Sequence, residues 1–181
     1  MLDASTSVCG INDDGLKLCT SITELNAMNN HKITTCAPFA RSLKILNASG
    51  TCGIDDLGIS SCTSIVELYA AQNHKITTCV SFARSLIKLN AVGNCGIDDN
   101  GIKLCIFITA LYAANNPKIT TCVPFARTLI HLDARGTCGI SDIGLIKCNM
   151  IKALFADGNQ KITSYKNLLN FYKQSKAIKF A

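Results

Sequence analysis

Cysteine and aspartate are the residues of this 181-residue chain whose types and spacing are best suited to chemistry. The segment TCGIDDLGISSC at 51–62 places two cysteines ten positions apart, around two adjacent aspartates and a glycine. Thiolates bind soft metals or form disulfides, and carboxylates bind calcium. The segment therefore raises three hypotheses: a metal-binding loop, a redox pair, or a part of the scaffold.

The spacing of these residues disfavours the common metal sites. The chain contains no C-x-x-C pair, which is the usual pattern of structural zinc. A calcium loop of the EF-hand kind needs oxygen ligands at alternate positions and a closing glutamate. The chain has only two glutamates, Glu24 and Glu67, and neither closes such a loop. We therefore expect no metal and no cofactor.

The chain also lacks the patterns of a catalytic site. It contains no phosphate-binding P-loop, no G-x-S-x-G and no H-E-x-x-H. Its three histidines are scattered: His31 and His74 share one phase of the internal repeat described below, and His131 stands at another. We predict that the protein is not an enzyme and assign it no catalytic residue.

Composition is that of a folded protein without a membrane span. Hydrophobic residues make up 48% of the chain and charged residues 17%, and no run of 18 apolar residues occurs. Eleven cysteines without a visible signal peptide indicate reduced thiols, so we expect a cytoplasmic location. The net charge of +6 arises mainly from residues 161–181, which carry five lysines and no acid.

An internal repeat of 43 residues positions all of these side chains. The cysteine-rich segment occurs four times, at 8–19, 51–62, 94–105 and 137–148. Each unit divides into coils of 22 and 21 residues, and both coils begin with apolar-x-x-Leu-x-Ala. Eight coil starts are visible, at Leu2, Leu25, Leu46, Leu68, Leu89, Leu111, Leu132 and Leu154.

A single coil is too small to bury its own apolar face, so the coils must stack into a solenoid. The Leu and Ala of each start would point inward from a short strand, and parallel strands would stack about 4.8 Å apart. Asp56 and its repeat equivalents suit the N-cap of a short helix, although the residue before each can also cap. The cysteines occupy three repeat phases, which favours small buried hydrophobes; metal-binding ladders and disulfides between coils are the alternatives.

This pattern resembles the leucine-rich repeat family over essentially the whole chain, and its cysteine-containing subtype in particular. Segment 54–59, IDDLGI, stands for the I-T-D-x-G-L part of that subtype's pattern. The resemblance implies an α/β solenoid, a horseshoe segment with a parallel concave β-sheet and short helical or 3-10 segments on the convex side. It also implies an inward asparagine ladder, here Asn30, Asn73, Asn116 and Asn159. Whether Thr51 or Cys52 faces the core stays open.

Similar arrays occur in F-box-associated, giant-virus and amoebal proteins. The resemblance implies a protein-binding module, because exposed strand residues carry function on such folds. Tyrosine or phenylalanine recurs on every second strand, and aromatic side chains are good anchors for a protein partner. The last strands depart most from the repeat average. The predicted partner-binding residues are Tyr69, Tyr112, His131, Asp133, Arg135, Phe155 and Asp157.

We expect one domain over residues 1–181, with a partial uncapped first coil at 1–21, regular repeats at 22–162 and a basic C-terminal cap at 163–181. The open first coil predicts end-on self-association. One alternative function is a substrate-recognition adaptor of a ubiquitin ligase. Another is binding of nucleic acid or an anionic surface through the basic tail and two ladders of cations, Arg41, Arg84 and Arg127 with Lys32, Lys75, Lys118 and Lys161.

Overall fold

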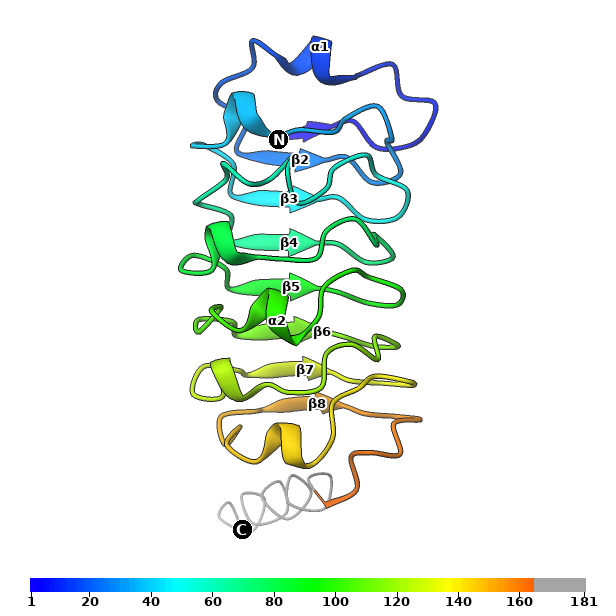
Figure 1. Ribbon diagram of the computed structural model, residues 1–181, viewed down its shortest axis with the longest axis vertical. Helices are drawn as coiled ribbons and strands as arrows, with labels where there is room; N and C mark the ends of the chain where they lie inside the picture. The colour runs from blue at the N-terminus through cyan, green and yellow to red at the C-terminus, as the bar shows by residue number, and fades with distance from the viewer. Residues whose placement is uncertain (165–181) are drawn as a thin grey trace, which may run out of the picture.

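The computed structural model describes residues 1–164, so nearly all of the predicted C-terminal cap at 163–181 lies outside the described residues. Eight strands form one parallel sheet and pair in chain order from β1 to β8. The coils stack along one long axis, each contributing one strand to the sheet (Figure 1). The predicted solenoid of stacked coils with a parallel sheet is confirmed.

Each strand is two or three residues long and centres on, or begins with, the leucine of its coil start. The strands are β1 Leu2–Asp3, β2 Glu24–Asn26, β3 Ile45–Asn47, β4 Glu67–Tyr69, β5 Lys88–Asn90, β6 Ala110–Tyr112, β7 His131–Asp133 and β8 Ala153–Phe155. The short helices are α1 Asp13–Leu16 and α2 Asp99–Ile102, and the 3-10 helices are η1 Ala37–Phe39, η2 Val80–Phe82, η3 Val123–Phe125 and η4 Ile143–Leu145.

A residue with positive φ follows every strand at the same phase, four positions after the leucine. From Asn29 to Gly136 this residue alternates between a larger side chain, as in Asn29 with φ +59°, and a glycine, as in Gly50 with φ +70°. The alternation has a steric cause. The Asn29 amide lies over Gly50, where a Cβ would stand 2.0 Å from its oxygen, and the same oxygen accepts from the Thr51 N–H at 3.1 Å. The glycine therefore makes room for a cap supplied by the preceding coil.

The core is continuous along the stack, because equivalent side chains of successive coils lie on one another. Leucines face leucines in register throughout the sheet, as in Leu46 on Leu68. Phe39, Phe82 and Phe125 project inward from the 3-10 helices and are 1% exposed. Each such side chain stabilises the fold by roughly 1.5–3 kcal/mol through burial. No coil could bury this surface without its neighbours.

The cysteine of the Thr51–Cys52 pair faces the core. Cys52 is 0% exposed, whereas Thr51 lies at the surface. The backbone turns at Gly50, whose φ is +70°, and three residues later Gly53 packs against the carbonyl of His31. The cysteine between these two glycines turns inward. All eleven cysteines are thiols, and nine are buried. Cys9 and Cys19 of the first coil are partly exposed.

Of the two neighbouring N-cap candidates in each coil, the first caps the α-helices, and the Asp56 type of residue does not. The cap of α2 is Asp98, whose Oδ1 accepts from the Gly101 N–H at 2.9 Å, and Asn12 caps α1 in the same way. The following aspartate instead reaches the next coil: Asp99 Oδ1 accepts from the Thr120 N–H at 2.8 Å. The stacking of coils decides the difference, because it presents that threonine beside the second carboxylate and not the first.

Each of the four asparagines of the ladder joins its own coil to the one before it, so every second coil carries such a bridge. Asn116 is 0% exposed, and its Nδ2 donates to the carbonyls of Ala91 at 2.9 Å and Ile97 at 3.2 Å. Its Oδ1 accepts from the Lys118 N–H at 3.0 Å. Within the described part of the chain, every buried side-chain nitrogen or oxygen has a hydrogen-bond partner. The ladder therefore satisfies carbonyls that the irregular backbone cannot satisfy itself.

The first strand has one neighbour. β1 pairs with β2, and its other edge meets no strand among residues 1–164. End-on self-association stays a prediction.

Candidate partner-binding surface

The side chains on either side of each strand leucine form one surface, which we call the sheet face. Register pairing arranges them in two files that run along the stack. One file holds Asn26, Asn47, Tyr69, Asn90, Tyr112, Asp133 and Phe155, and the other holds Glu24, Ile45, Glu67, Lys88, Ala110, His131 and Ala153. Five of the seven predicted partner-binding residues lie in these files, and the other two, Arg135 and Asp157, follow two residues after Asp133 and Phe155.

Tyr69 lies at the centre of a polar cluster on β4 and β5. Its hydroxyl donates to Glu67 Oε2 at 2.7 Å and accepts from Lys88 Nζ at 2.7 Å. Lys88 Nζ also lies 3.3 Å from Glu67 Oε2 and 5.0 Å from the centroid of the Tyr69 ring. These contacts hold the ring in one orientation. Tyr69 is therefore a positioned aromatic side chain rather than a freely rotating one.

The cluster shifts the pKa of each of its groups. The hydrogen bond from Tyr69 is the largest cause that lowers the pKa of Glu67, and the bond to Tyr69 is the largest that raises the pKa of Lys88. Burial is the largest cause that raises the pKa of Tyr69. Glu67 is thus kept as a carboxylate and Lys88 as an ammonium ion at neutral pH. The two charges offset each other on the sheet face.

A shallow hollow lies beside this cluster, toward the first coil. Its volume is about 190 Å³, and its lining includes Glu24, Asn26, Ile45, Asn47 and Tyr69. Tyr69 forms one wall and Ile45 an apolar patch. The hollow can accept a side chain of a partner.

Asp133 does not present its carboxylate to solvent, so the expectation that it is exposed is wrong. Asp133 is 6% exposed, and the guanidinium of Arg135 binds it through both ends: Nε to Oδ1 at 2.9 Å and Nη2 to Oδ2 at 2.7 Å. The hydrogen bond to Asp133 is the largest cause that raises the pKa of Arg135. Only the arginine of this pair is available to a partner.

The remaining candidates differ in their exposure. Phe155 is 52% exposed and pairs in register with Asp133. His131 and Asp157 are exposed, and Tyr112 is half-buried between Asn90 and Asp133. The C-terminal part of the sheet face is therefore its most exposed part.

The cysteines are arranged as core thiols. Three pairs of thiols from neighbouring coils are hydrogen-bonded: Cys36 with Cys62, Cys79 with Cys105, and Cys122 with Cys148. The bond with Cys105, together with burial, raises the pKa of Cys79 well above its ordinary value. Cys79 therefore stays a protonated thiol, whereas the same bond lowers the pKa of its partner Cys105. Metal binding and nucleophilic attack need a thiolate. Residues 1–164 contain no group of three or more His, Cys, Asp or Glu side chains that could hold a metal ion.

Eight parallel strands in chain order, leucine on leucine, with a buried asparagine joining successive pairs of coils, decide the fold. The protein folds as a parallel solenoid of leucine-based coils, as its resemblance to the leucine-rich repeat family predicts. No family model matches its sequence, and no curated protein matches it. Among solved structures it is similar to the functional domain of InlJ from Listeria monocytogenes, described as including a cysteine ladder, with 16% identity and a TM-score of 0.31. That match covers 89% of this chain and 53% of the other, so the solenoid spans about half the length of InlJ's functional domain.

Two residues that position Tyr69 on the sheet face were not among those predicted from the sequence. Glu67 and Lys88 hold Tyr69 but were not among the candidates. The available signal was their shared phase, because Glu67 and Lys88 are register partners of opposite charge on adjacent strands. In the described residues, no helix is long and apolar enough to cross a membrane.

Proposed function

We propose that the solenoid is a non-enzymatic interaction module that binds a partner protein through its sheet face. The observation that carries the proposal is the row of Tyr69, Tyr112 and Phe155 on alternate strands of a single rigid sheet. Alternate strands are about 10 Å apart. Aromatic side chains at that spacing can each fill a separate pocket of a partner, and aromatic anchors dominate the energy of most interfaces.

The fixed orientation of Tyr69 supports the same proposal. Ordering a side chain on binding weakens an interface by about 0.5–1.5 kcal/mol. Because Glu67 and Lys88 already hold the Tyr69 hydroxyl, most of that ordering is complete before the partner arrives. The exposed Arg135 and His131 beside the row add polar contacts that define the partner's orientation.

Partner capture tests the proposal. The wild-type chain and the double variant Tyr69→Ala with Tyr112→Ala are used as baits in the native cell, and the bound proteins are identified by mass spectrometry. We expect the double variant to lose its specific partners, because truncation of two anchors weakens binding by roughly 4 kcal/mol or about 1000-fold. The control Leu57→Ala, at a residue 81% exposed away from the sheet, should retain them. Retention of the same partners by the double variant would show that the sheet face is not the binding surface.

A ubiquitin-ligase adaptor is the special case in which a captured partner is a ligase subunit. Nucleic-acid binding through the cation ladders is the competing proposal. Against it, Lys32 Nζ and Lys118 Nζ donate to the carbonyls of Cys9 and Cys95, each at 3.1 Å, which favours a structural role for that ladder. A complex with nucleic acid that weakens steeply with added salt would favour the competing proposal.

A further inference from the structure

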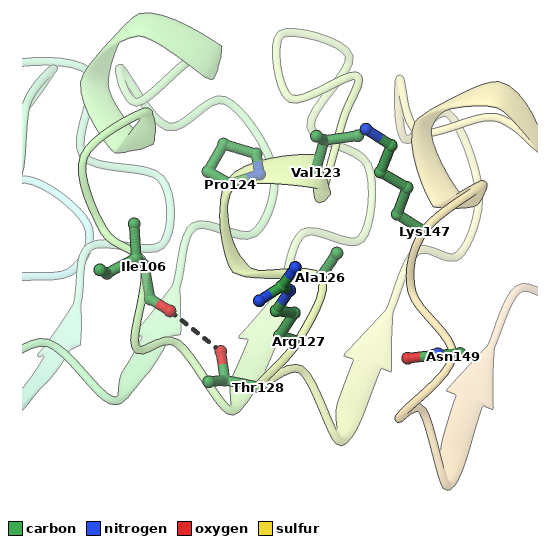
Figure 2. Close-up of a pocket in the computed structure, with 8 residues that line it drawn as sticks. All are labelled: Ile106, Val123, Pro124, Ala126, Arg127, Thr128, Lys147 and Asn149. Atoms are coloured by element: carbon green, nitrogen blue, oxygen red, sulfur yellow. Dashed lines mark hydrogen bonds between the residues drawn. The ribbon is translucent and has the colours of Figure 1, made fainter.

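A groove of about 740 Å³ lies on the edge of the solenoid where the chain enters its strands, away from the sheet face. We call it the edge groove. Ile106 lines one side, Val123, Pro124 and Arg127 form the middle, and Lys147 and Asn149 line the other side. Figure 2 shows segment 123–128 between Ile106 and the pair Lys147 and Asn149. Three successive coils therefore build the groove.

The middle of the edge groove is fixed by hydrogen bonds to the preceding coil. Thr128 Oγ1 donates to the carbonyls of Ile106 at 3.2 Å and Ile108 at 2.9 Å, and it also lies 3.1 Å from the Phe125 carbonyl (Figure 2 draws the bond to Ile106). Phe125 itself is buried in the core. The groove is therefore part of the rigid stack.

The chemistry of the edge groove is apolar and cationic. Ile106 is 51% and Val123 40% exposed, although both are large hydrophobic side chains. Arg127 and Lys147 are exposed, and neither forms an ion pair within residues 1–164. No acidic residue lines the groove. Two unpaired cations beside exposed apolar surface are complementary to a segment that carries both carboxylates and an apolar side chain.

The internal repeat shows that this combination is not inherited by every copy. Arg41, Arg84 and Arg127 share one phase of the repeat, so an arginine stands at the same place in each unit. The phase of Lys147, in contrast, holds Ser61 and Leu104 in the earlier units. The second cation therefore belongs to the last groove alone and is not required for stacking.

We propose that the edge groove binds an extended acidic segment of a partner protein. Its Asp or Glu side chains lie against Arg127 and Lys147, and an apolar side chain lies on Ile106, Val123 and Pro124. The chain's own residues 165–181 are unsuited to this place, because they carry four lysines and no acid. This surface is separate from the sheet face, so a partner on one leaves the other accessible.

The test is fluorescence anisotropy with the full chain and three labelled peptides. The first peptide alternates pairs of glutamate with leucine or phenylalanine, the second has glutamine in place of glutamate, and the third has serine in place of the apolar residues. We expect binding of the first peptide, and weaker binding of the other two. In the variant Arg127→Glu with Lys147→Glu, affinity for the first peptide should fall at least about tenfold, because two attractions become repulsions.

The matched control is Arg84→Glu with Leu104→Glu, at the same two phases one unit earlier. It should bind the acidic peptide within about twofold of the wild type, because neither residue lines the edge groove. The milder pair Arg127→Gln with Lys147→Gln tests the site without charge reversal, and circular dichroism confirms that each variant keeps its fold. Tyr69→Ala with Tyr112→Ala should leave peptide binding unchanged, which separates this site from the sheet face.

Three results would overturn the proposal. The first is equal binding of the glutamate and glutamine peptides. The second is an equal loss in the Arg84 and Arg127 double variants, which would indicate a general effect of net charge. The third is tighter binding of a single-stranded oligouridine probe that is lost on the same reversal, because the edge groove would then be a nucleic-acid site.

Discussion

Replacement of Asn116 by alanine should destabilise the solenoid strongly, although it changes a single polar side chain. The side chain is 0% exposed and makes three hydrogen bonds: to the carbonyls of Ala91 and Ile97 and from the Lys118 N–H. Alanine leaves all three backbone groups without that partner. Each unsatisfied buried group costs about 1–3 kcal/mol.

Three such losses predict a decrease in the free energy of unfolding of about 3–9 kcal/mol. That is a large part of the 5–15 kcal/mol that stabilises a typical domain. Urea denaturation followed by circular dichroism gives the free energy of unfolding and the slope m together. The slope should stay near its wild-type value, because the change removes contacts from the folded state without changing the surface exposed on unfolding.

The matched control is Asn94→Ala, which makes the same chemical change at an exposed turn position. The Asn94 backbone N–H donates to Gln72 Oε1 at 3.0 Å, and alanine keeps that group. We expect a change within about 0.5 kcal/mol. A cost below about 1 kcal/mol for Asn116→Ala, or one equal to that of the control, would refute the idea that the ladder supplies essential backbone partners.

Three further outcomes are expected. Gly50→Ala should destabilise the fold by about 2 kcal/mol in the same urea assay, because it forces φ +70° on an L side chain and displaces the Asn29 amide cap. The control Gly10→Ala, with open space around the glycine, should change stability by less than about 0.5 kcal/mol. Tyr69→Phe should move the Glu67 pKa up toward its ordinary value in an NMR titration of the carboxyl carbon, and an unmoved pKa would contradict the assignment. Because the folded pKa of Glu67 is lowered, its contribution to stability is present at neutral pH and is lost as pH falls through that folded pKa. In native protein, brief alkylation should label the two cysteines of the first coil and spare the nine buried ones until urea is added, and early labelling of the nine by mass spectrometry would contradict a packed thiol core.

The sequence predicted the stack because its signals are local and repeated. The spacing of 43 residues, the inward Leu and Ala of each coil start and the asparagine phase all follow from which residue types recur. The strands lie where the leucines predict them, from Leu25 in β2 to Leu132 in β7. Hydrophobic periodicity within one coil is enough for this, since every coil must bury the same face.

The candidate surface could be predicted only in part. The placement of Tyr69, Tyr112 and Phe155 on alternate strands follows from the period, and the structure has them on one face. The polar cluster around Tyr69 and the burial of Asp133 under Arg135 did not follow from it. Both depend on side-chain conformations, which a repeat pattern does not specify.

By itself, the sequence determined the period, the strand positions and the residues that face inward on each strand. Only the tertiary structure decided that Cys52 turns inward while Thr51 does not, and that Asp98 caps its own helix while Asp99 holds the next coil. The edge groove likewise exists only because three coils lie side by side. The Asp98 cap is a local bond, but the other features depend on contacts between residues of neighbouring coils, such as Asp99 and Thr120, which lie 21 positions apart. The stacking of coils creates those contacts.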